Sequence, residues 1–142
     1  MKPLSLTLKN FGPYINETID FTKFEDSSLF LISGKTGSGK TTIFDGMSYA
    51  LFGESSGKLR LGKEMRSTFA DPSEATEVTL LFKHNEFLYE LNRLPEQELF
   101  KKRGTGVRKQ SAKISLIVKD AQGKELRAYS KRREVDELIQ EL

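Results

Sequence analysis

Apolar and polar residues alternate at the start of the chain, as they do in half-buried β-strands. Leu4, Leu6 and Leu8 are separated by polar residues, and the apolar residues of segment 15–21 again share one parity. The residues between these segments, NFGP (10–13), include the glycine and proline that favour a turn. The pattern therefore predicts two strands joined by a tight connection.

A strand and a helix of different character follow. The run LFLIS (29–33) has no polar alternation, which is typical of a central strand covered on both faces. Apolar residues between 43 and 51 then recur with the spacing of one helical face. Gly53 stands where a helix C-terminus favours glycine. We expect a buried strand, a loop and a helix in that order.

The second half of the chain predicts antiparallel strands. Segments 77–84 and 86–93 alternate around His84–Asn85, which indicates a hairpin. Segments 113–120 and 124–130 flank the turn AQG and predict two further strands. Together with the N-terminal strands they predict an antiparallel sheet.

The last segment, SKRREVDELIQEL (130–142), predicts an amphipathic helix with Ser130 as its N-cap. It contains no glycine, asparagine or proline that would end the helix. We therefore expect residues 1–142 to form one lobe of a domain whose chain continues past Leu142.

The loop GKTGSGKTT (34–42), between the predicted strand and helix, fits the phosphate-binding pattern G-x-x-x-x-G-K-[ST]. Its glycines allow backbone N–H groups to converge on an anion, and the N-terminus of the next helix adds partial positive charge. Lys40 is expected to reach the β- and γ-phosphates of a nucleotide and the Thr41 hydroxyl to bind Mg²⁺. Lys35 is expected to point into solvent. The predicted phosphate-binding residues are Gly34, Thr36, Gly37, Ser38, Gly39, Lys40, Thr41 and Thr42.

Hydrolysis of the nucleotide requires further residues that this chain lacks. No aspartate ends a run of four apolar residues, because Lys119 interrupts LIVKD (116–120). Asp45 lies about one helical turn beyond Thr41, too far to substitute. We therefore expect no complete catalytic set here. The sequence DAQG (120–123) fits D-x-x-G, but no N-K-x-D or T-K-x-D follows it, so adenine is favoured over guanine.

Composition excludes several classes of protein. No apolar run approaches the roughly 20 residues of a membrane-spanning helix, and the N-terminus lacks a signal-peptide pattern. The absence of cysteine excludes disulfides, thiolate metal sites and cysteine nucleophiles. We predict a cytoplasmic protein with no membrane partner.

The net charge of +3 conceals one basic stretch, KKRGTGVRKQSAK (101–113), with six positive residues and no acidic one. Such a stretch is suited to sequence-independent contact with DNA phosphates, and a solvated hairpin loop is the alternative. No aromatic residue interleaves with these charges, so base stacking is not predicted. The candidate DNA-binding residues are Lys101, Lys102, Arg103, Arg108 and Lys109.

Three stretches carry a family resemblance: LKNFGPY (8–14), LFLISGKTGSGKTTIFDGMSYALFG (29–53) and MRSTFADPSEATEVTLLFKHNEFLYELNRLPEQ (65–97). Together they resemble the N-terminal ATPase segment of the SbcC family, the ATPase subunits of bacterial SbcCD nucleases, which belong with the SMC-like, ABC-type DNA-repair ATPases. Many relatives have proline at the position of Lys35, and this difference leaves the phosphate-contacting positions intact.

The resemblance implies an α/β P-loop NTPase fold, in which residues 1–142 are the N-terminal lobe of an ABC-type ATPase head with a mixed sheet. A distant C-terminal lobe, reached through a long coiled coil, would supply the missing catalytic motifs. Two heads would enclose ATP with Mg²⁺, and their closure would control access of double-stranded DNA to the nuclease subunit SbcD, which would hold Mn²⁺. The protein would then be associated with the nucleoid.

The resemblance also implies that Asn10, Phe11 and Arg66 lie around the adenosine, whereas Gln97 is given no catalytic role. Two other functions stay open at this point. One is the nucleotide-binding subunit of an ABC transporter, and the other is a nucleotide- or DNA-binding module without turnover.

Overall fold

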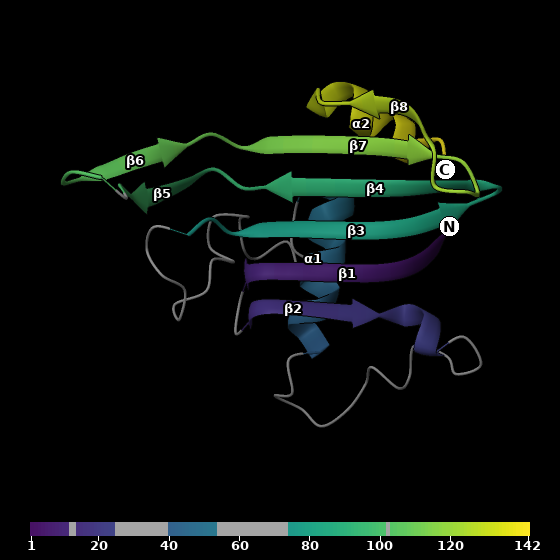
Figure 1. Ribbon diagram of the computed structural model, residues 1–142, viewed down its shortest axis with the longest axis horizontal. Helices are drawn as coiled ribbons and strands as arrows, with labels where there is room; N and C mark the ends of the chain where they lie inside the picture. Colours follow the sequence, from purple (N-terminus) through teal and green to yellow (C-terminus); the bar gives the residue numbers. More distant parts are fainter. Residues whose placement is uncertain (12–13, 25–39, 54–73, 102) are drawn as a thin grey trace.

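The computed structural model describes residues 1–11, 14–24, 40–53, 74–101 and 103–142. In these ranges a six-stranded sheet has the order β2-β1-β3-β4-β7-β8, and all its neighbouring strands are antiparallel (Figure 1). The sheet consists of β1 (Lys2–Phe11), β2 (Tyr14–Asp20), β3 (Glu77–His84), β4 (Phe87–Leu94), β7 (Lys113–Lys119) and β8 (Glu125–Tyr129). The other described elements are a ribbon of β5 (Gln97–Phe100) and β6 (Val107–Gln110), the 3₁₀ turn η1 (Phe21–Phe24), and the helices α1 (Lys40–Phe52) and α2 (Arg132–Gln140).

One face of the sheet is apolar and covered by both helices (Figure 1). A single row of the sheet register consists of four fully buried leucines from neighbouring strands: Leu6, Leu80, Leu91 and Leu116. Val135 of α2 is fully buried in the same cluster. Burial of one such side chain stabilises the fold by roughly 1.5–3 kcal/mol, so this row anchors the helices to the sheet.

The opposite face is polar, as the period of two along each strand requires. The hydroxyls of Thr7 and Thr18 lie 3.1 Å apart on β1 and β2. Asn92 of β4 donates from its side-chain amide to the hydroxyl of Thr79 on β3, at 2.9 Å. This separation of apolar and polar faces is the reason why alternation in the sequence located these strands correctly.

Helix α1 passes very close to β1 at Gly46. A Cβ atom at this position would lie 2.7 Å from Cδ2 of Leu8 and 3.4 Å from Cδ2 of Leu6. Since non-bonded carbon atoms prefer separations of about 3.5–4.0 Å, only glycine fits here without displacing the core. The contact sets the distance between the helix and the sheet.

Several sequence predictions are confirmed. The predicted hairpin turns at Asn85, which has φ 56°, and the turn between β7 and β8 contains Gly123 with φ 89°. Helix α1 ends at Phe52, and Gly53 follows with φ 79°, the left-handed conformation that favours glycine. The predicted strand 29–33 lies outside the described residues, so the predicted mixed sheet is not tested.

Two expectations about the C-terminal half are wrong. Helix α2 begins at Arg132 with Lys131 as its N-cap, and no side chain caps it, so Ser130 stands one position too early. The stretch after β4 forms the β5–β6 ribbon, which the sequence did not reveal because strands of four residues are too short to show a period of two. Within the described ranges no helix is long and apolar enough to span a membrane.

Candidate functional site

Helix α1 begins at Lys40, the lysine of the predicted phosphate-binding loop. Its first turn contains no acidic residue. The free N–H groups of a helix N-terminus carry partial positive charge, so a phosphate fits this end of α1 electrostatically. The loop residues 34–39 lie outside the described residues, as do the side chains of Lys40, Thr41 and Thr42.

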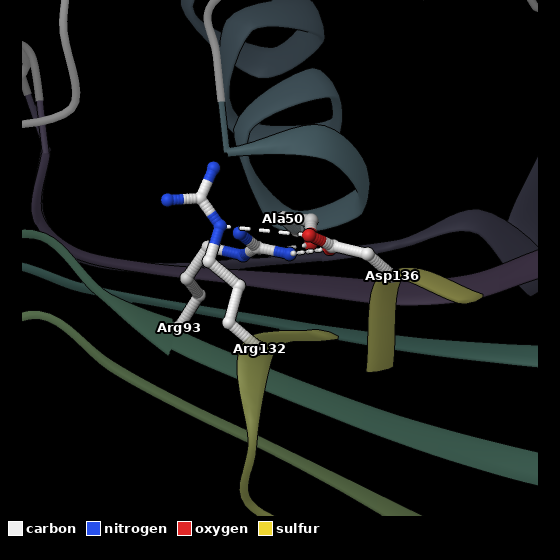
Figure 2. Close-up of polar contacts among 4 residues, drawn as sticks. All are labelled: Ala50, Arg93, Arg132 and Asp136. Carbon is white, nitrogen blue, oxygen red and sulfur yellow. Dashed lines mark hydrogen bonds and ion pairs between the residues drawn. The ribbon is translucent and has the colours of Figure 1, made fainter. Parts of the chain in front are cut away.

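The other end of α1 is held by Arg93 of β4 (Figure 2). The Nε atom of Arg93 donates to the carbonyl oxygen of Ala50 at 3.2 Å. Its Nη2 atom lies 3.5 Å from Oδ1 of Asp136 on α2, and Nε of Arg132 lies 3.5 Å from Oδ2 of the same carboxylate. Arg93 therefore joins the C-terminal end of α1 to β4 and to α2.

Burial and charge act against each other in this cluster. The side chain of Arg93 is only 6% exposed, and its burial lowers its pKa, while Asp136 and Tyr49 oppose that shift. The guanidinium carbon lies 5.9 Å from the centre of the Tyr49 ring, within range of a cation–π contact. Burial raises the pKa of Tyr49, so its hydroxyl stays protonated at neutral pH. Because Arg93 and Arg132 share one carboxylate, the cluster retains positive charge.

The residues predicted to lie near adenosine occupy the end of β1. The Phe11 side chain is fully buried, with its ring centre 6.3 Å from that of Tyr49, so it offers a nucleotide no side-chain surface. Asn10 has φ 51°, and its side-chain amide donates to the carbonyl oxygen of Ala75 at 2.9 Å. Arg66 lies outside the described residues. The adenosine assignment of these three residues remains a prediction.

Gln97, at the start of the ribbon, has a structural position. Its Oε1 atom accepts a hydrogen bond from the backbone N–H of Thr76 at 2.8 Å, and its Nε2 atom donates to the carbonyl oxygen of Thr76 at 3.1 Å. The Thr76 hydroxyl in turn donates to the carbonyl oxygen of Asn10 at 2.7 Å. These bonds join the ends of β1 and β3 to the base of the ribbon.

The predicted DNA-binding residues lie on the β5–β6 ribbon, which extends past the ends of β3 and β4 (Figure 1). Lys101, Arg103 and Arg108 are exposed. Lys109 is also exposed, but its Nζ atom lies 2.7 Å from Oε1 of Glu96, and this hydrogen bond raises the pKa of the lysine. Lys102 lies outside the described residues.

The predicted Mg²⁺ contact of Thr41 concerns a side chain outside the described part of the protein. Among the described residues, no group of three or more His, Cys, Asp or Glu side chains is arranged to hold a metal ion. Asp45, on α1, is 5% exposed. Its burial in the helix face is compatible with a role in the fold, and no catalytic role is assigned to it.

Sequence reasoning missed Arg93 and Asp136, which position α1. One signal was present, because Arg93 shares the parity of Tyr89 and Leu91, whose side chains are buried against the helices. An arginine at an inward position of a strand requires a buried partner. The identity of that partner, Asp136 on α2, depends on how the helix packs and is not visible in the sequence.

Comparison with known families gives the class of protein. A family described as "AAA domain" matches residues 5–142, so the chain belongs to this family and has an α/β P-loop NTPase fold. It is also similar to proteins whose names identify them as SbcC, one of the two components of the nuclease SbcCD. The relative from Lactococcus lactis subsp. lactis is 50% identical over 119 residues, which are 82% of this chain and 11% of that protein.

Two further relatives carry the same name. The protein from Vibrio cholerae serotype O1 is 46% identical over 127 residues, which are 89% of this chain and 12% of that protein. The protein from Staphylococcus aureus (strain JH9) is 54% identical over 93 residues, which are 66% of this chain and 9% of that protein. The resemblance to an N-terminal SbcC ATPase segment is thereby confirmed. The chain spans only 11% and 12% of the length of the first two relatives.

Proposed function

We propose that this chain is the ATP-binding lobe of the ATPase subunit of an SbcCD-type nuclease. The observation that carries the proposal is the start of α1 at Lys40, directly after a G-x-x-x-x-G-K-T run, in a chain of the AAA-domain family. Loop residues 34–39 and the first turn of α1 would hold the phosphates of ATP. A Mg²⁺ ion on the Thr41 hydroxyl would neutralise part of the phosphate charge.

The anchoring of α1 supports this role. A phosphate site needs a fixed helix N-terminus, and α1 is fixed at Gly46 by contact with β1 and at Ala50 by the hydrogen bond from Arg93. Asp136 extends the same anchor to α2. The residues that hold the helix are therefore distinct from those that would hold the nucleotide.

The proposal includes the remainder of an ABC-type head. Residues 1–142 would be its N-terminal lobe, and a C-terminal lobe would supply the catalytic residues that this sequence lacks. Two heads would close around ATP, in complex with a nuclease subunit of the SbcD type that carries Mn²⁺. ATP binding would then favour the closed state over the open one.

Double-stranded DNA is the proposed partner of the ribbon. Lys101, Arg103 and Arg108 make no ion pair with any acidic side chain that the structure describes. Lys113 and Arg132 line a cavity of about 370 Å³ at the base of the ribbon, so positive charge continues toward α2. Exposed cations of this kind contact phosphates without reading bases.

Calorimetric titration with ATP and Mg²⁺ tests the nucleotide site. Lys40→Ala is expected to weaken binding at least about tenfold, because a hydrogen bond to a charged group contributes about 1.5–3 kcal/mol. Lys35→Ala is the matched control, since it removes a lysine from the same loop that is predicted to face solvent. Equal affinities of the two variants would contradict the assignment.

Phosphate release, followed in parallel, tests whether the site is shared between lobes. The proposal predicts turnover when the C-terminal lobe is present and none from residues 1–142 alone. Sustained turnover by residues 1–142, abolished by Lys40→Ala, would show that the catalytic set is complete within this chain.

Charge reversal tests the DNA contact. The triple variant Lys101→Glu, Arg103→Glu, Arg108→Glu is expected to lower DNA affinity and to reduce the slope of log K against log salt by about 3, roughly one per phosphate contact. Lys124→Glu, in the turn at the far end of β7, is the single-charge control. An unchanged salt slope in the triple variant would remove DNA binding from the proposal.

A further inference from the structure

The β5–β6 ribbon exposes two large apolar residues at its outer end. Phe100 is opposite Val107 in the strand register, and they are 56% and 46% exposed. They form the last residue pair before the loop, which is closed by a hydrogen bond from the Lys101 N–H to the carbonyl oxygen of Gly106 at 3.0 Å. The outer end of the ribbon therefore presents an apolar surface next to its basic loop.

The exposure of Phe100 is not the result of a ribbon that is free on both faces. Gln97 and Leu99, which alternate with Glu98 and Phe100 along β5, are only 4% and 0% exposed. The ribbon is thus packed through one face and presents Phe100 on the other. A position that is fixed in this way preorganises the aromatic ring for contact with a ligand.

The charges beside this apolar pair identify a ligand class. Lys101, adjacent to Phe100, and Arg108, adjacent to Val107, are exposed cations without an acidic partner in the described ranges, as is Arg103 in the loop. Lys109, lower on the ribbon, is instead paired with Glu96. An exposed aromatic ring with unpaired cations around it matches a nucleic acid strand, whose bases stack on rings and whose phosphates bind cations.

We propose that Phe100 stacks on an unpaired base at a DNA end while Lys101, Arg103 and Arg108 hold the adjoining phosphates. This inference rests on the DNA contact in the proposed function and adds a preference for open ends over continuous duplex. Bases inside a duplex are already stacked on each other, so insertion of the ring there carries an unstacking penalty that an unpaired base does not. The sequence pattern concealed the ring because Phe100 lies one residue before the basic stretch.

A test must separate stacking from the packing of the ribbon itself, since a Phe–Val cross-strand pair also stabilises a hairpin. Phe100→Leu keeps an apolar side chain opposite Val107 but removes the aromatic face. Phe100→Tyr keeps both. The full-length protein and these variants are titrated with two duplexes of equal length, one with an unpaired 3′ extension and one closed at both ends by non-nucleotide linkers. A 2-aminopurine in the extension reports stacking by fluorescence quenching.

The expected result is selective. Phe100→Leu weakens binding to the open-ended duplex about 5- to 50-fold and removes the quenching, whereas its affinity for the closed duplex stays within twofold, roughly the range that one base stack supports. Phe100→Tyr retains the affinity and the quenching of the unsubstituted protein. Unchanged end preference in Phe100→Leu overturns the inference, and so does an equal loss on both duplexes, which would assign the ring to the ribbon's own packing.

The charge-reversed triple variant separates this inference from the proposed function. If it binds both duplexes as tightly as the unsubstituted protein does, the DNA contact itself fails and the stacking inference fails with it. If it weakens both duplexes while Phe100→Leu changes neither, the DNA contact stands and only the stacking inference is overturned.

Discussion

The contact of α1 with β1 at Gly46 predicts a substitution whose effect has the opposite sign to helix propensity. Alanine stabilises a helix interior by about 1 kcal/mol relative to glycine, so Gly46→Ala would be stabilising if only α1 mattered. In the structure, however, the new Cβ atom would lie 2.7 Å from Cδ2 of Leu8, a fully buried side chain. The two effects therefore compete at one atom.

The magnitudes favour destabilisation. The 2.7 Å separation is about 1 Å shorter than carbon atoms prefer, so α1 or Leu8 must move by roughly that amount. Overpacking of a core by one methyl group costs about 1–3 kcal/mol. After subtraction of about 1 kcal/mol for helix propensity, we expect Gly46→Ala to lower the free energy of unfolding by roughly 0.5–2 kcal/mol.

Denaturant unfolding of a double-mutant cycle with Leu8→Val measures this competition. Valine lacks the δ carbons of leucine, so the nearest remaining neighbour of the new Cβ atom is Cδ2 of Leu6 at 3.4 Å. In the Leu8→Val background, Gly46→Ala should become stabilising by about 0.5–1 kcal/mol because the helix term then dominates. A stabilising Gly46→Ala in the unsubstituted chain, or the same sign in both backgrounds, would refute the close contact.

Two further substitutions test the buried polar groups by the same unfolding measurement. Arg93→Met is expected to cost about 1–3 kcal/mol and Asp136→Asn less than about 1 kcal/mol, because the Arg93 bond to Ala50 is buried while Asp136 is 33% exposed on its side chain; equal losses would contradict this order. Gln97→Met should cost roughly 2–3 kcal/mol because it leaves the fully buried Thr76 with an unsatisfied N–H, whereas Gln110→Met, at the register partner of Gln97, should have little effect; similar losses for the two glutamines would show that Gln97 is not structurally special.

The strands of the main sheet could be predicted because each has one buried and one polar face. Alternation over seven or eight residues, as in β3 and β4, distinguishes a strand from a helix. The turns were equally visible, since Asn85 and Gly123 adopt positive φ, which few residue types tolerate. These are local properties, and a sequence contains all of the information about them.

The order of the strands and the partners of the buried charges could not be predicted in the same way. The pairing of β1 with β3 joins segments separated by the whole of the loop and α1, and β7 pairs with β4 across the ribbon. The ribbon was missed because its strands have four residues each and because Glu98 and Phe100 are on the exposed face. The phosphate-binding loop could be predicted from its pattern alone, since its chemistry needs only glycines, a lysine and a hydroxyl in consecutive positions.

The positions of Arg93 and of the predicted nucleotide site suggest why an arginine is retained in this core. The loop would act on the N-terminus of α1, whereas Arg93 holds its C-terminal end and binds Asp136 of α2. A displacement of α1 along its axis would stretch the 3.2 Å bond to Ala50 and the 3.5 Å contact with Asp136 together. An apolar residue at position 93 would fill the same space without transmitting such a displacement, because it has no directional bond to either helix. The cost of burying the guanidinium is therefore best understood as the means by which α1 and α2 keep one fixed relation.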